Sequence, residues 1–179
     1  MNRFLLPLGV FALLAAVLAV GIWHSPDKGI IVSPLLNKPA PQFALPNLAD
    51  PRRTVSSTDL KGRWYLFNVW GTWCYACKDE HAMLLKVRES GAVPLVGLDW
   101  KDDDARAQAW LTRFGNPYEV IAVDRSGRAA IDWGVYGAPE TFLVNPQGIV
   151  VYKHVGALTE DVWQREILPR VKGSAAGSS

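Results

Sequence analysis

The hydrophobic pattern changes abruptly near residue 74, and this change constrains the fold more than any other feature of the sequence. Residues 64–70 (WYLFNVW) form a short, nearly continuous apolar run, which is typical of a strand buried on both faces. From residue 77 to residue 89 the apolar side chains instead recur at helical spacing, and Ser90-Gly91 supplies a stop signal. The sequence therefore predicts a strand followed directly by a helix, with Cys74 and Cys77 at the junction.

The same alternation continues downstream. A second apolar run at residues 93–100 precedes a helix that begins with aspartates at 102–104 and ends at Gly115-Asn116-Pro117. Because strand, helix and strand in succession favour parallel pairing, we expect right-handed crossovers here, whereas residues 145–148 (NPQG) predict a hairpin turn. The chain is thus expected to form an α/β domain with a central mixed sheet flanked by helices. The remaining predicted elements are a strand at 119–123, a short helix ending at Trp133, strands at 141–145 and 149–155, and a helix at 159–171.

The N-terminal segment is apolar enough to cross a membrane. Residues 4–23 contain no charged side chain, and a helix of that length spans about 30 Å of hydrocarbon. Arg3 lies before this run, and the bias of basic residues toward the cytoplasm places the rest of the chain outside it. A cleaved signal peptide needs a shorter apolar core and then small residues at Ala-x-Ala spacing, for which there is no clear site. We predict a retained anchor at residues 1–23 in preference to a cleaved signal.

Composition divides the rest of the chain. Residues 24–41 contain four prolines and no helical period, which predicts a tether at residues 24–38. Small polar residues make up the tail at 173–179, which we expect to be disordered. Between them, residues 39–172 are numerous enough for one compact domain with its own core.

Overall composition excludes several classes of protein. The 19 basic residues are matched by 17 acidic ones, which excludes a nucleic-acid binder that works through bulk charge. Eight Trp, five Tyr and six Phe are too many for a charge-rich disordered chain. Two cysteines cannot form a disulfide framework or a four-thiolate zinc site, so any cysteine chemistry involves Cys74 and Cys77 together.

The position of the cysteine pair predicts redox chemistry. At a helix N-terminus, unpaired N–H groups and the helix dipole favour a thiolate at Cys74, while Cys77 can close a disulfide with it three residues later. We expect Cys74 to attack, Cys77 to resolve, and the Cys74–Cys77 disulfide to serve as the redox group without a bound cofactor. The alternatives are a reduced structural pair, and a zinc or copper site that adds His81 and His154. For His81 we prefer a solvent-facing or capping position.

Pro139 is the second informative residue, because it directly precedes a predicted strand. Such a proline can be cis and expose the backbone beside a reactive site, or it can be an ordinary turn proline. The sequence leaves both alternatives open.

Three segments together resemble one known family. NVWGTWCYACKDEH at residues 68–81, DWKDDDARAQAWL at 99–111 and GVYGAPETFLVNPQG at 134–148 resemble the CcmG or DsbE family, membrane-anchored thioredoxin-like proteins of cytochrome c maturation. The resemblance covers nearly all of residues 37–170 and implies a thioredoxin-like fold. One departure is Tyr75, where family members commonly carry proline, and the residues between the cysteines tune the reduction potential.

The resemblance also implies a function and partners. Its members reduce the oxidised Cys-x-x-Cys-His disulfide of apocytochrome c before haem attachment, directly or with a cytochrome c maturation thioredoxin partner. Their electrons come from a membrane thiol transporter of the DsbD or CcdA kind. The implied location is the bacterial inner membrane, single-pass, with the domain in the periplasm. The alternative within the same chemistry is a general thiol–disulfide reductase or isomerase for other exported proteins, and the alternative from a different class is a metal-binding chaperone.

Site residues follow from the same resemblance. It implies that Cys74 and Cys77 are catalytic, that Pro139 is the cis proline facing them, and that Glu80 and Glu140 lie around the site. The competing expectation for both acids is a solvated surface position. Aromatic residues are candidates for a rim around the thiols, although each can instead belong to the core; they are Trp70, Trp73, Tyr75 and Tyr136.

Overall fold

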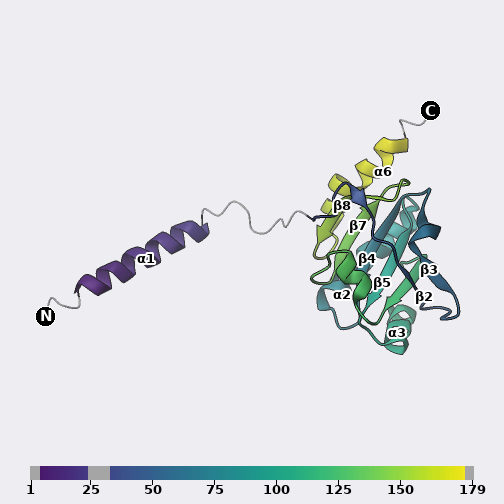
Figure 1. Ribbon diagram of the computed structural model, residues 1–179, viewed down its shortest axis with the longest axis horizontal. Helices are drawn as coiled ribbons and strands as arrows, with labels where there is room; N and C mark the ends of the chain where they lie inside the picture. The colour runs from purple at the N-terminus through teal and green to yellow at the C-terminus, as the bar shows by residue number, and fades with distance from the viewer. Residues whose placement is uncertain (1–4, 24–32, 176–179) are drawn as a thin grey trace. The chain divides into compact units, whose positions relative to one another are not determined.

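The computed structural model describes residues 5–23 and 33–175, and its contacts divide the chain into two units, Met1–Val32 and Ser33–Ser179 (Figure 1). The first unit contains helix α1 (Leu5–Trp23). Among the residues described, no helix combines the length and the hydropathy that a membrane span requires. The retained anchor therefore stays a prediction, and residues 24–32 of the predicted tether lie outside the described residues.

A mixed sheet forms the centre of the second unit, as the alternation of periods predicted. Over residues 33–175 its six strands follow the order β1-β8-β7-β4-β5-β6. The pairs β4·β5 and β5·β6 are parallel, whereas β7 runs antiparallel to both β4 and β8. The strands are β1 (Lys38–Pro39), β4 (Tyr65–Trp70), β5 (Leu95–Trp100), β6 (Val120–Asp124), β7 (Glu140–Val144) and β8 (Ile149–Val155), and a separate hairpin pairs β2 (Ala44–Pro46) with β3 (Thr54–Ser56).

Helices connect the strands where the sequence predicted them. The C-terminal helix begins as expected, with Thr159 as its N-cap, but its middle turn is a π-helix. The helical elements are α2 (Tyr75–Ser90), α3 (Asp104–Phe114), α4 (Arg128–Asp132), α5 (Glu160–Val162), the π-helical turn η3 (Trp163–Ile167), α6 (Leu168–Ala175) and the 3-10 turn η2 (Ser57–Leu60).

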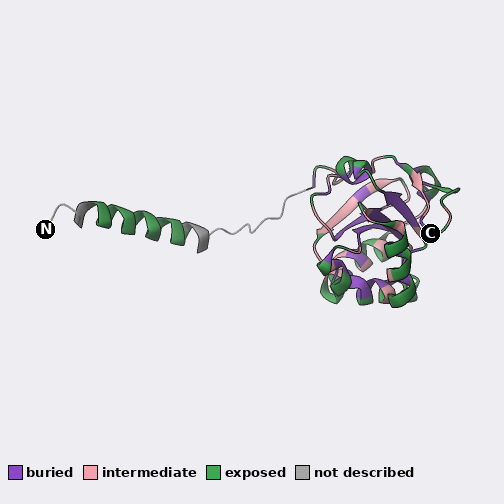
Figure 2. Cartoon of the chain, turned by 90° about the horizontal axis from the view of Figure 1, so that it is seen from below, coloured by how far each residue is buried: buried purple, intermediate pink, exposed green. Residues whose placement is uncertain are grey.

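The sheet separates two apolar cores, and β4 contributes to both. Leu66 and Trp70 face the core shared with α2 and α3, whereas Phe67 and Val69 face the core that contains Trp133. Side chains alternate between the faces of a strand, so every apolar residue of β4 is buried on one side or the other. Figure 2 shows these buried strands at the centre of the domain, with helices whose outer sides are exposed.

Local signals explain where the helices beside β4 and β5 begin and end. The side chain of Asp103 caps α3 by accepting a hydrogen bond from the N–H of Arg106 at 3.0 Å. Helix α2 ends at Gly91, whose φ of 62° lies in the left-handed region that glycine adopts without strain. Both signals were visible in the sequence as an aspartate run and as Ser90-Gly91.

The domain boundaries differ from those predicted at both ends. Ser33 is buried, Asn37 N–H donates to Val150 O at 2.8 Å, and Lys38 begins an edge strand. The domain therefore starts at residue 33 and not at residue 39, because the proline-rich segment pairs through its backbone without any side-chain period. At the other end α6 continues to Ala175, so the first residues of the predicted tail are helical, while 176–179 lie outside the described residues.

Trp133 should be a main source of stability for the core opposite α2. It is fully buried, with its ring stacked on Phe67 at 4.1 Å between centroids and edge-on to Phe142 at 5.1 Å. Trp133→Ala should lower the free energy of unfolding by about 3–5 kcal/mol in denaturant titrations, because it leaves a large cavity. Ile131→Ala is the matched control, since Ile131 is exposed on α4, and should change it by less than about 0.5 kcal/mol. Equal losses in both variants would contradict this assignment.

Candidate active site

The cysteine pair lies where β4 passes into α2, as the sequence predicted. Cys74 is the N-cap of α2, and the backbone N–H of Cys77 donates to Cys74 Sγ at 3.1 Å. The two residues form a disulfide, and both are buried, Cys77 more completely than Cys74. In the reduced protein the same N–H and the helix N-terminus favour negative charge on the Cys74 sulfur.

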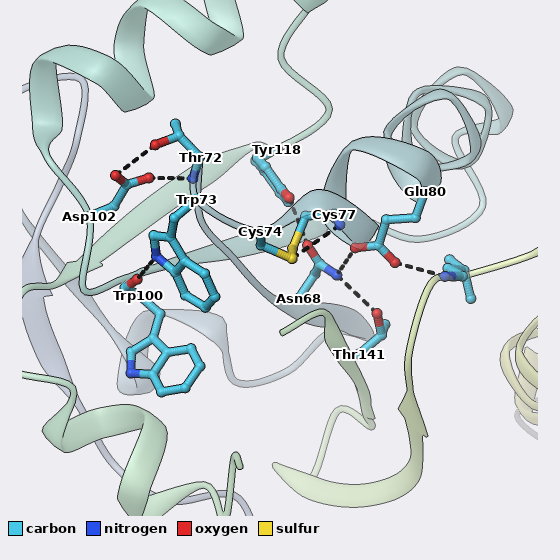
Figure 3. The surroundings of a disulfide bond; sticks show 11 residues. Asn68, Thr72, Trp73, Cys74, Cys77, Glu80, Trp100, Asp102, Tyr118 and Thr141 are labelled. Atoms are coloured by element: carbon cyan, nitrogen blue, oxygen red, sulfur yellow. Dashed lines mark hydrogen bonds between the residues drawn. A yellow bond between two sulfur atoms is a disulfide. The ribbon is translucent and has the colours of Figure 1, made fainter. Parts of the chain in front are cut away.

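The turn that leads into Cys74 is tied to the neighbouring strand (Figure 3). Both the backbone N–H and the hydroxyl of Thr72 donate to the carboxylate of Asp102, the hydroxyl at 2.8 Å. The indole N–H of Trp73 donates to the carbonyl oxygen of Trp100 at 3.0 Å. Since β4 and β5 are parallel, their carboxyl ends lie at the same edge of the sheet, and β5 fixes the position from which Cys74 projects.

Three of the four candidate rim residues are exposed. Trp73, Tyr75 and Tyr136 expose 51%, 81% and 54% of their surface, which leaves them free to contact a partner. Trp70 is instead buried, with its ring between those of Trp110 and Tyr118 at 5.4 and 5.5 Å. Of the two alternatives given for Trp70, the core position is the correct one, because the alternation along β4 turns its side chain into the core.

Pro139 lies at the same end of the sheet as the cysteines. The Ala138–Pro139 peptide bond is cis, which settles the two alternatives left open by the sequence. In the antiparallel register of β4 and β7, Val69 pairs with Glu140. Pro139 directly precedes Glu140 and therefore lies at the level where β4 ends. The carbonyl oxygen of Pro139 accepts a hydrogen bond from the N–H of Gly156 at 2.9 Å.

Glu140 is a buried, compensated charge. Its carboxylate forms an ion pair with Lys153 at 2.8 Å and accepts the N–H of Tyr136 at 3.2 Å. The Lys153 side chain is itself buried, and it also donates to Gly134 O at 3.0 Å. The competing expectation of a solvated surface position is wrong. Alternation along β7 also places Glu140 with Phe142 on the sheet face opposite α2, so the structure does not bring Glu140 and Glu80 together.

Glu80 is buried on the face of α2 that carries Cys77. It follows Cys77 by three residues, which is close to one helical turn. Its carboxylate accepts hydrogen bonds from Asn68 Nδ2 at 2.9 Å and from the N–H of Leu158 at 2.7 Å (Figure 3). Burial raises the pKa of Glu80 to about 7, and these two hydrogen bonds offset part of that increase. A solvated position is wrong for this acid too.

The sequence interpretation missed three residues of this network. Asn68 is fully buried in β4, and besides Glu80 its amide contacts two hydroxyl groups. The Tyr118 hydroxyl donates to Asn68 Oδ1 at 2.7 Å, and Asn68 Nδ2 donates to Thr141 Oγ1 at 3.0 Å. One signal was available, because an amide within the apolar run at 64–70 needs buried hydrogen-bond partners.

The histidines lie in separate environments. His81 is buried edge-on to Trp110, with Nε2 3.2 Å from Phe114 O and 3.0 Å from Gly115 O. Because carbonyl oxygens accept hydrogen bonds, Nε2 carries a proton and donates to them, and burial lowers the pKa of His81. The solvent-facing position for His81 is therefore wrong, whereas a capping position agrees with its hydrogen bonds to the carbonyl oxygens at the C-terminal end of α3. His154 Nε2 lies 3.2 Å from the carbonyl oxygen of Ala157. Over the described ranges, no group of three or more His, Cys, Asp or Glu side chains is arranged to hold a metal ion.

Glu80 should make the stability of the domain depend on pH. Its pKa is about 7 when folded against 4.5 for an ordinary carboxyl, so the folded protein binds the proton more tightly. Stability should therefore fall as the pH rises from about 4.5 to 7 and level off above it. The wild type should lose about 3 kcal/mol relative to Glu80→Gln between pH 4.5 and pH 8, in denaturant titrations at both pH values.

Two features make this comparison specific. The pKa of Asp99 is also raised to about 7, chiefly by burial, but Asp99 is present in both proteins and cancels. Glu89→Gln, at an exposed position of α2, should leave the wild-type pH profile unchanged. A Glu80→Gln profile parallel to that of the wild type would show that the carboxyl does not titrate in this range.

Known proteins resemble this chain over most of its length. The Redoxin family pattern matches residues 35–168. A thiol:disulfide interchange protein DsbE from Allochromatium vinosum is 47% identical over 170 residues, which cover 95% of this chain and 93% of that protein. The corresponding protein of Pseudomonas aeruginosa is 44% identical over 165 residues, covering 92% and 90% of the two chains.

A solved structure shares the fold. The crystal structure of a protein described as a DsbE from Chlorobium tepidum superposes with a TM-score of 0.64 at 25% identity, covering 78% of this chain and 96% of that one. The architecture is accordingly thioredoxin-like. The likeness to the DsbE relatives extends over nearly the whole length of both sequences, and Cys74 and Cys77 form a disulfide at the position a redox pair requires. This chain belongs to the DsbE, or CcmG, family of thioredoxin-like proteins and is a thiol–disulfide oxidoreductase.

Proposed function

We propose that this oxidoreductase works as a reductase of the Cys-x-x-Cys-His disulfide of apocytochrome c, which must be opened before haem attachment. The observation that carries the reducing direction is the buried Glu80 carboxyl, one helical turn from Cys77. The substrate assignment is supported by the resemblance of the three sequence segments at 68–81, 99–111 and 134–148 to proteins of cytochrome c maturation.

The proposed reaction has two exchange steps. The Cys74 thiolate attacks one sulfur of the substrate disulfide, which forms a mixed disulfide and releases the other sulfur as a thiolate that takes a proton from water. Cys77 then loses its thiol proton, for which the ionised Glu80 carboxylate is the acceptor, and attacks Cys74 Sγ. The second substrate thiolate leaves, the Cys74–Cys77 disulfide forms, and two electrons have passed to the substrate.

The surroundings of the cysteines favour electron donation. A carboxylate near the pair opposes a second negative charge on sulfur, whereas the Cys77 N–H and the helix start favour a thiolate at Cys74. A strong oxidant such as DsbA owes its potential to a stabilised reduced form. By limiting that stabilisation, Glu80 keeps the disulfide relatively favourable and makes the dithiol the better donor. The pairing of Glu140 with Lys153 leaves Glu80 as the principal acid in this effect.

The same proposal implies a source of electrons and a cellular location. After each turnover the disulfide must be reduced again, and in an oxidising compartment this requires a dedicated donor such as a membrane thiol transporter of the DsbD or CcdA kind. The uncharged run at residues 4–23 supports an anchor in the bacterial inner membrane with the domain in the periplasm. Donor, enzyme and substrate would then meet at one membrane face.

The order of attack should be visible by trapping. Cys77→Ser should accumulate a mixed disulfide through Cys74, because the resolving thiol is missing. Non-reducing electrophoresis and mass spectrometry after incubation with an oxidised Cys-x-x-Cys-His peptide would identify the linked residue. Cys74→Ser should trap little, and trapping mainly through Cys77 in that variant would reverse the assignment.

The substrate should be visible in cells. A strain that lacks this protein should lose its c-type cytochromes, measured by haem staining and reduced-minus-oxidised absorbance spectra. The wild-type chain should restore them and Cys74→Ser should not, because the attacking sulfur is absent. If cytochromes persist while other exported proteins accumulate non-native disulfides, the general reductase or isomerase is the correct function and the cytochrome c assignment is wrong.

A further inference from the structure

We propose that Tyr118 is a positioning residue of this reaction, which acts on Glu80 through the Asn68 amide. The inference rests on the proposed role of Glu80 as proton acceptor for Cys77. The three side chains form a continuous chain in Figure 3, from the Tyr118 hydroxyl through both ends of the Asn68 amide to the carboxylate. The Tyr118 hydroxyl donates to Asn68, so its effect on the carboxylate passes through the Asn68 amide.

The Asn68 amide has an acceptor, Oδ1, and a donor, Nδ2. Its Oδ1 accepts from the Tyr118 hydroxyl at 2.7 Å, and its Nδ2 donates to Glu80 at 2.9 Å and to Thr141 at 3.0 Å. If the amide rotated by half a turn, Oδ1 would face the Glu80 carboxylate, and two acceptors would meet in a buried place. By donating to Oδ1, the Tyr118 hydroxyl stabilises the observed orientation, in which Nδ2 faces the carboxylate.

Tyr118 is well suited to remain a donor. Burial raises the pKa of Tyr118 well above its ordinary value, and the charges of Glu80 and Asp99 add to the increase, so the phenol keeps its proton. Its ring stacks on Trp70 and lies against the backbone of Gly97, where a Cβ would come within 3.1 Å of the ring. The hydroxyl therefore has little freedom to leave Asn68.

Other groups around Glu80 do not replace this contact. The N–H of Leu158 donates to the second carboxylate oxygen, and Thr141 on β7 is uncharged. His81, the next residue on α2, directs its ring nitrogen to Phe114 O and Gly115 O. The charge of Asp99 on β5 helps to raise the pKa of Tyr118, and burial raises the pKa of Asp99 itself to about 7. The titration of Asp99 therefore has to be separated from that of Glu80.

The test measures the titration of Glu80 directly. In full-length protein with 13C-labelled glutamate, the Glu80 carboxyl signal is the one missing in Glu80→Gln, and labelling glutamate alone leaves Asp99 unseen. Tyr118→Phe should raise the Glu80 midpoint by about one pH unit, because the freed amide no longer stabilises the carboxylate as well. At pH 7 the resolving step by Cys77 should slow by about fivefold, with no change in the first attack by Cys74.

Three further variants separate positioning from packing. Tyr65→Phe is the matched control, since it removes a tyrosine hydroxyl from the buried strand β4 on the opposite face, and it should leave the midpoint unchanged. In an Asn68→Leu background, Tyr118→Phe should cause no further shift, because the route through the amide is gone. Fluorotyrosine at position 118 is a stronger donor and should move the midpoint downward without removing any contact.

The outcomes distinguish this proposal from the function on which it rests. An unchanged midpoint in both the Tyr118→Phe and the fluorotyrosine proteins, or a shift that persists without Asn68, would overturn the positioning role. A normal resolving rate in Glu80→Gln would overturn the proton-acceptor role of Glu80 instead, while the Tyr118-dependent midpoint would still stand.

Discussion

The hydrogen bonds of one buried amide hold the site in its arrangement. Asn68 on β4 joins Glu80 on α2, Tyr118 after α3 and Thr141 on β7. A buried amide or carboxyl costs several kcal/mol when it lacks partners, so these elements are stable only in the relative positions that satisfy all of the groups. This network joins β4 to α2 on either side of the turn between them, and the hydrogen bond from Thr72 to Asp102 fixes the turn itself.

Reactivity at this site is a balance between opposing electrostatic effects. The helix start and the Cys77 N–H draw negative charge onto Cys74, whereas a buried carboxyl behind Cys77 resists further charge. The second effect varies around neutral pH, because burial raises the pKa of Glu80 to about 7. A carboxyl that titrates near neutral pH can take a proton from Cys77 in one half of the cycle and return it in the other.

Much of this could be predicted from the sequence, and the failures have physical causes. The strands and helices around Cys74 were predictable because period and caps are local signals, as at Asp103 and Gly91. The start at Ser33 was not, because an edge strand that pairs through backbone atoms leaves no side-chain pattern. For Glu80 and Glu140 a solvated surface position stayed open as the competing expectation, because residue type suggests solvent, and only tertiary packing reveals that both acids are buried.

The two buried acids show how environment assigns different tasks to the same chemical group. Glu140 forms an ion pair with Lys153, and the Lys153 ammonium group also donates a hydrogen bond to Gly134 O. The ion pair therefore helps to fix the loop that leads to Pro139. Removing either partner would leave a buried charge unpaired, which is strongly destabilising. Among the described residues, the donors that hydrogen-bond the Glu80 carboxylate are both neutral, namely the Asn68 amide and the backbone N–H of Leu158. Neutral donors stabilise the Glu80 anion without cancelling its charge, so burial still raises the pKa of Glu80 to about 7 and its carboxyl can exchange a proton near neutral pH.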